Sequence, residues 1–161
     1  MGSFDRFTKP KWKDKDWIVR KKAVEELNDQ ETLIDIAKND SNWAVRIAAI
    51  EKINDGSVLA DIALNDSDGF VRKIAVKKIS DDAVLGYIIK NDNSALVRKT
   101  AVKKISDVDV LKDVKENDSH YEIMKTAGKF TRPDLKKYFG KSKIYPVRIA
   151  AEERLRELGY E

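Results

Sequence analysis

The dipeptide Val-Arg recurs every 26 residues in this chain, at positions 19–20, 45–46, 71–72 and 97–98. Other residues recur with the same spacing, in the order Ala, aliphatic residue, Leu and Asn-Asp. They are Ala23, Ala49, Ala75 and Ala101; Leu27, Ile53, Ile79 and Ile105; Leu33, Leu59, Leu85 and Leu111; and Asp40, Asp66, Asp92 and Asp118. A fixed period of about 20 to 50 residues is typical of solenoids, in which each unit buries its apolar face on the next. The period therefore predicts a solenoid.

Within one unit, residues 41–66, the apolar spacing predicts two antiparallel helices of about eleven and nine residues. Ser41 is placed to cap the first helix, and Ser67, Asn93 and Ser119 are its equivalents. Asp55 is placed to cap the second helix, and its equivalents are Asp29, Asp81 and Asp107. Helices this short are marginal on their own. We therefore expect stacking between units to stabilise them, with the repeated Ala allowing close approach.

An Asp precedes each repeated Arg by six residues, which puts the Asp in a turn and the Arg in the following helix. The set is Asp14 and Arg20, Asp40 and Arg46, Asp66 and Arg72, and Asp92 and Arg98. Such a row could bind a ligand, or it could form a ladder of ion pairs and turn hydrogen bonds between units. We favour the structural ladder, because a ligand site would not need the same pair in every unit.

The unit built from Asp, Val-Arg and Ala in two short helices resembles the HEAT repeat. Its length is similar to that of the compact HEAT-like repeats first associated with phycobilisome lyases. The resemblance implies an all-α fold, a right-handed α-solenoid whose second helices line a concave surface. Family members are mostly protein-interaction scaffolds, a minority are bilin lyases, and some helical-repeat relatives are DNA glycosylases.

The array divides into about six units, with the last one partial. Residues 1–13 are expected to cap the N-terminal end, and the solenoid is expected to span 14–161. Units are predicted near 14–40, 41–66, 67–92 and 93–118, with a degenerate unit at 119–142 and a partial one at 143–161. In the degenerate unit Met124 replaces the Arg and Gly128 lies within the predicted helix, where it costs about 1 kcal/mol relative to Ala. The second helix of each unit could be α or 3₁₀.

Catalytic chemistry has little support in this composition. The chain has no Cys and a single His, His120, which excludes thiol catalysis, disulfides and histidine clusters. Gly140-Lys141-Ser142 lacks the first Gly of a phosphate-binding loop, and Asp66-Ser67-Asp68-Gly69 lacks the closing Glu of a calcium loop. We expect no enzyme activity, no cofactor and no metal. Without an apolar run long enough for a membrane span or a signal peptide, we expect a cytoplasmic location.

Two sets of exposed charges follow the repeat. The first helices carry lysines four residues apart, and this ridge continues into a basic stretch with interleaved aromatic residues. The ridge consists of Lys73, Lys77, Lys99, Lys103, Lys125, Lys129, Lys136, Lys137 and Lys141, with Lys78 and Lys104 beside it. The second helices carry Asp35, Asp61, Tyr87 and Asp113 at equivalent positions. The resemblance implies that this acidic row lines the concave face.

These features lead to three hypotheses for the function. The first is a monomeric, non-enzymatic scaffold that binds a basic or amphipathic segment of a partner protein along the acidic row. The second is binding of nucleic acid or of an anionic surface through the lysine ridge and residues 125–148. The third, implied only by the resemblance, is a bilin-lyase-like accessory protein.

Overall fold

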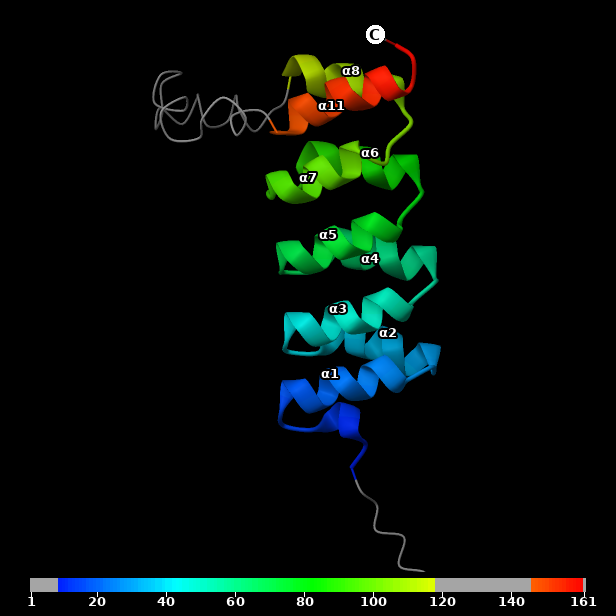
Figure 1. Ribbon diagram of the computed structural model, residues 1–161, viewed down its shortest axis with the longest axis vertical. Coiled ribbons are helices and arrows are strands. Elements are labelled where there is room, and N and C mark those ends of the chain that lie inside the picture. The colour runs from blue at the N-terminus through cyan, green and yellow to red at the C-terminus, as the bar shows by residue number, and fades with distance from the viewer. Residues whose placement is uncertain (1–8, 118–145, 161) are drawn as a thin grey trace, which may run out of the picture.

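The computed structural model describes residues 9–117 and 146–160, and within these the chain is entirely helical. A short 3₁₀-helix, η1 (Lys11–Lys13), precedes the α-helices, which stack along one axis (Figure 1). They are α1 (Trp17–Glu26), α2 (Gln30–Asn39), α3 (Trp43–Lys52), α4 (Gly56–Asn65), α5 (Gly69–Lys78), α6 (Asp82–Asn91), α7 (Ala95–Val102), α8 (Val108–Asn117) and α11 (Pro146–Glu157). The contacts between these helices fit a helical repeat.

Each layer of the stack combines the second helix of one unit with the first helix of the next. The paired helices are α2 with α3, α4 with α5, and α6 with α7, while η1 packs on α1. The first helices also pack on one another, α1 on α3, α3 on α5 and α5 on α7. These layers are shifted by half a unit from the units that the sequence defines, because the short turn around Asp40 folds α2 back against α3.

Helix α11 completes the last described layer. It packs against α8 and α7, as α7 packs against α6 and α5 (Figure 1). It thus takes the position of the next first helix after α7 in the described stack, and it lies within residues 143–161, the predicted partial unit. The reason lies in its sequence, because Val147, Ala151 and Leu155 repeat the spacing of the buried Val97, Ala101 and Ile105 and are themselves buried. The predicted degenerate unit, 119–142, lies outside the described residues.

The helix caps differ from the prediction for the first helices and agree with it for the second. Asn42 and Asp68 cap α3 and α5, so both helices start one residue later than Ser41 and Ser67 would place them. The cause is the preceding turn, in which the Asp40 carboxylate accepts a hydrogen bond from the Asn42 amide at 2.8 Å. The second helices are α-helical and begin at the predicted aspartates, Asp29, Asp55, Asp81 and Asp107.

The repeated Ala lies where neighbouring first helices touch. Ala49, Ala75 and Ala101 are fully buried, and α5 packs against both α3 and α7. We expect Ala75→Leu to lower the free energy of unfolding by about 1–3 kcal/mol, since three added carbon atoms overpack this contact. Urea unfolding followed by circular dichroism measures the change. Ala83→Leu, at an exposed position of α6, is the matched control, and an equal effect of both variants would contradict the close contact at Ala75.

Candidate interaction surface

The repeated arginines join successive layers. Arg72 donates from Nε and Nη2 to the two carboxylate oxygens of Asp92, at 2.8 and 3.0 Å, and from Nη1 to the Asp66 carbonyl at 2.8 Å. Its Nη2 also donates to the Asn93 side-chain oxygen at 2.7 Å. The same guanidinium–carboxylate pairs join Arg20 to Asp40 and Arg46 to Asp66. Arg20, Arg46 and Arg72 therefore each bind the carboxylate of the next turn and the carbonyl of their own turn.

The eight residues of the predicted ladder all lie in these turns and the helices that follow them. At its ends, Arg20 donates to the Asp14 carbonyl and Arg98 to the Asp92 carbonyl. Burial of the Asp40 carboxyl favours its neutral form, but hydrogen bonds from Arg20 and the Asn42 amide outweigh this and lower its pKa. The Arg20–Asp40 pair thus stabilises the fold above the ordinary pKa of Asp, and this stabilisation is lost as the pH falls through the lowered pKa.

A second row of cations closes the opposite ends of the first helices. The Lys52 ammonium donates to the Glu25 carbonyl at 2.7 Å, and the Lys78 ammonium donates to the Ile53 carbonyl at 2.6 Å. Lys104 and Arg154 make the equivalent bonds, to the carbonyls of Lys77 and Ile105. Cations stabilise the unpaired carbonyls at a helix C-terminus. Lys78 and Lys104 therefore bind carbonyls at helix ends, whereas the sequence predicts that they face solvent beside the lysine ridge.

The predicted acidic row is neutralised in part by lysines of the preceding second helix. Asp61 on α4 pairs with Lys38 on α2 at 2.6 Å, and Asp113 on α8 lies 3.8 Å from Lys90 on α6. The Asp35 carboxylate accepts a hydrogen bond from the side-chain amide of Asn39 at 2.8 Å. All three aspartates are exposed. The surface formed by α2, α4, α6 and α8 therefore presents exposed ion pairs, and not the uniform negative charge that we expected.

An apolar pair replaces the ion pair in the middle of this surface. The position of Lys38 and Lys90 is occupied on α4 by Leu64, and the position of Asp61 and Asp113 is occupied on α6 by Tyr87. Leu64 is 40% exposed and Tyr87 is 60% exposed. A shallow pocket lined by both side chains, with Ile88 and Asn91, lies between the two helices. We call Leu64, Tyr87 and the ion pairs Lys38–Asp61 and Lys90–Asp113 the second-helix surface.

The sequence had singled out Tyr87 but missed Leu64 and both lysines. The missing signal was the position three residues after the acidic row, occupied by Lys38, Leu64, Lys90 and Glu116. Comparing that position between units shows that Leu64 replaces a lysine in one unit, and that Tyr87 replaces an aspartate in the next unit. Only the packing of α2 on α4 and of α4 on α6 shows that the two positions meet.

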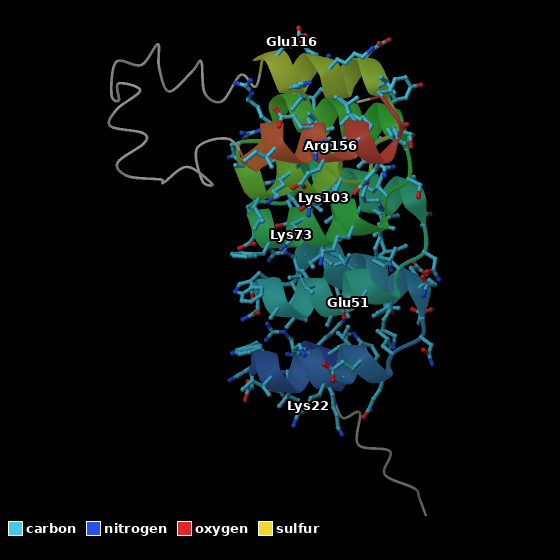
Figure 2. The ribbon with its side chains drawn as sticks, turned by 45° about the horizontal axis from the view of Figure 1, so that its top comes forward. Lys22, Glu51, Lys73, Lys103, Glu116 and Arg156 are labelled. Atoms are coloured by element: carbon cyan, nitrogen blue, oxygen red, sulfur yellow. The ribbon has the colours of Figure 1, made fainter. Side chains whose placement is uncertain are left out.

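The lysine ridge covers two layers of the described structure. Lys73, Lys77, Lys99 and Lys103 follow one another on α5 and α7, and Figure 2 shows Lys73 and Lys103 on the face that carries Glu51. Glu51 borders the ridge on α3, and Ile149 and Glu153 border it on α11, at positions equivalent to Lys99 and Lys103. The predicted continuation through Lys125, Lys129, Lys136, Lys137 and Lys141 lies outside the described residues.

Within residues 9–117 and 146–160, no group of three or more acidic or histidine side chains could hold a metal ion. His120 lies outside these ranges. In the same part of the chain, no helix has both the length and the apolar character that crossing a membrane requires.

The second-helix surface can bind another molecule, because it has exposed apolar side chains beside charged groups whose ion pairs can be exchanged for others. Ion pairs this exposed contribute little to stability, about 0–1 kcal/mol each, so their partners can be exchanged at small cost. No family model, curated protein or solved structure matches this chain.

Proposed function

We propose that this protein is a non-enzymatic interaction module that holds a segment of a partner protein on the second-helix surface. Leu64 and Tyr87 act as the anchors, and the flanking pairs Lys38–Asp61 and Lys90–Asp113 set the charge pattern. The observation that carries the proposal is the replacement of a Lys–Asp pair by two exposed apolar side chains in the middle of the surface.

The energetics favour an anchor at this place. Burying a large apolar side chain contributes about 1.5–3 kcal/mol. Tyrosine is also enriched among the residues that dominate binding energies at interfaces. The shallow pocket between Leu64 and Tyr87 is also lined by Asn91 and Asp92, so it can receive a side chain that contacts both apolar anchors and places a polar group beside Asn91 or Asp92. The anchors therefore lie where a single inserted side chain would contact both.

The charges define the chemistry of the partner. Asp61 and Asp113 each lie beside a lysine, so a partner meets both signs on either side of the anchors. We therefore expect a segment with a central aromatic or aliphatic residue flanked by acidic and basic residues. This narrows the basic or amphipathic segment that the sequence predicts to an amphipathic segment with charges of both signs. Among the other two hypotheses, nucleic-acid binding is weakened because Glu51 and Glu153 border the lysine ridge.

The proposal predicts that Leu64→Lys combined with Tyr87→Asp abolishes binding while the fold is kept. The two substitutions reproduce the Lys–Asp pair of the neighbouring layers, so the helices and their charge pattern persist. Peptides are selected from a random displayed library on the wild-type protein, and their affinities are measured by fluorescence polarisation. We expect at least a tenfold loss on the double variant, which corresponds to about 1.4 kcal/mol.

Ile149→Lys on α11 is the matched control, because Ile149 has a similar exposure of 37% and lies on the opposite helices. It is expected to leave the affinity of the selected peptides unchanged. Selection of the same peptides, with equal affinity, by the wild type and the double variant would contradict the proposed anchors.

A further inference from the structure

A row of large apolar side chains lies at the start of the first helices. It consists of Trp17 and Ile18 on α1, Trp43 on α3, Phe70 on α5 and Leu96 on α7, and we call it the apolar row. These side chains are between 41% and 59% exposed. The rings of Trp43 and Phe70 lie 6.4 Å apart, so the row is continuous between α3 and α5. The exposed rings of Trp43 and Phe70 form one apolar patch, and large exposed apolar patches mark interaction sites.

Large and small residues are distributed along the row in an order that is largely self-complementary. The first helical position holds Trp17, Trp43, Gly69 and Ala95, and the second holds Ile18, Ala44, Phe70 and Leu96. Reversing the order of the four helices sets Trp17 against Ala95, Trp43 against Gly69 and Phe70 against Ala44. It also sets Ile18 against Leu96, so three of the four facing pairs bring a bulky side chain against a small one and the fourth brings two aliphatic side chains together.

The charges on the same helices are also reversed about the middle. Glu25, Glu51, Lys77 and Lys103 occupy equivalent positions, seven residues after the second helical position, and all four are exposed. Seven residues are nearly two helical turns, so these charges lie on the same side of the helices as Ile18, Phe70 and Leu96. Figure 2 shows Glu51 and Lys103 on one face of the stack. The first two helices are acidic at this position and the next two are basic.

We propose that a second copy of this chain docks on the apolar row and on these charges, around a two-fold axis parallel to the helices between α3 and α5. The axis places α1 opposite the α7 of the other copy and α3 opposite its α5. It pairs Glu25 with Lys103 and Glu51 with Lys77, each twice, as a symmetric interface requires. Lys21 comes opposite Lys99, and its charge is already paired with Glu25 at 2.7 Å.

A second copy explains this surface better than an anionic partner does. A nucleic acid or an anionic membrane would be attracted by Lys77 and Lys103 and repelled by Glu25 and Glu51. The reversed order of the four charges, together with three of the four size pairs, matches a partner with the same order. The dimer replaces the monomer that the sequence led us to expect, and it leaves the second-helix surface on the opposite helices open.

Sedimentation equilibrium over a wide concentration range tests the dimer. The wild-type chain is expected to reach twice the mass of one chain. Glu51→Lys and Lys77→Glu, each of which creates two like-charge contacts, are expected to raise the dissociation constant at least tenfold. Combining the two substitutions restores opposite charges, and we expect the dissociation constant to return to within threefold of the wild type. Trp43→Ser with Phe70→Ser is expected to be monomeric.

Circular dichroism establishes that each variant is folded, and the charge swap remains decisive even if removal of the aromatic rings unfolds the chain. A wild-type protein that stays monomeric at about 1 mM would overturn the proposal, as would a charge swap no better than its single variants. Binding of a monomer to phosphatidylserine vesicles that requires Trp43 and Phe70, in a chain that does not dimerise, would assign the row to a membrane instead.

Discussion

Arg72→Ala is expected to lower the free energy of unfolding by about 3–5 kcal/mol, the usual range for breaking a buried ion pair from one side. The Asp92 carboxylate, only 6% exposed, would lose two charge-assisted hydrogen bonds, and the Asp66 carbonyl would lose its donor. The guanidinium also joins the α4–α5 layer to the turn of the α6–α7 layer. Its loss therefore weakens the centre of the stack. Urea unfolding followed by circular dichroism measures the change.

Lys22→Ala on α1 is the control for a cation removed from an exposed position, where effects stay within about 0.5 kcal/mol. A second readout is amide hydrogen exchange. Because each layer contacts only its neighbours, we expect the loss of Arg72 to increase exchange most in α5 and α6. If Arg72→Ala destabilised the chain by less than about 1 kcal/mol, the ladder would not be what joins the layers.

Leu155→Ala is expected to lower the free energy of unfolding by about 2–5 kcal/mol, the range for emptying a buried leucine site. Leu155 is 1% exposed, and with Val147, Ala150 and Ala151 it forms the buried stripe of α11 against α7 and α8. Without α11, the last layer would expose Leu111 and Ile105, which are now fully buried. Thermal and urea unfolding of the purified variant measure the loss.

Ile149→Ala, on the exposed side of α11, is the matched control and is expected to have a small effect. Equal stabilities of Leu155→Ala and Ile149→Ala would show that α11 does not occupy the fifth layer. The helix propensities of Leu and Ile each differ from that of Ala by less than about 1 kcal/mol, which is too little to account for the expected difference between the two variants.

The helical stack could be predicted because it depends on short-range spacing. Val45, Ala49 and Ile53 recur at helical intervals, and each of them is fully buried. Asp29, Asp55 and Asp81 cap the second helices. Each carboxylate accepts a hydrogen bond from an amide two or three residues further along, so this interaction depends only on the local sequence. The apolar spacing and the helix caps are both contained within one unit, so they can be predicted without knowing how the units pack.

The register of the layers could not be predicted, because it depends on contacts between units. The sequence does not show that α3 pairs with α2, or that α11 lies on α7 across 28 residues outside the described ranges. It placed the first caps at Ser41 and Ser67, one residue early, because the hydrogen bonds of the Asp40 and Asp66 carboxylates in the turn were not foreseen.

The same reason limited the prediction of the site. Lys38 and Asp61 are 23 residues apart, three fewer than the repeat, so no inspection of a single unit brings them together. The sequence predicts that Lys78 and Lys104 face solvent, because the backbone carbonyls that they bind belong to the preceding layer. The repeated residues build the stack, and the proposed anchors Leu64 and Tyr87 depart from the repeat.

Mapping a selected peptide on the ¹⁵N-labelled protein by NMR tests the proposed binding surface most directly. The account predicts that the largest amide shift changes cluster near Leu64 at the end of α4 and from Tyr87 to Asp92 on α6. Changes are expected to be small on α3, α5 and α7. Shift changes centred on Lys73, Lys77, Lys99 and Lys103, with α4 and α6 unaffected, would contradict it.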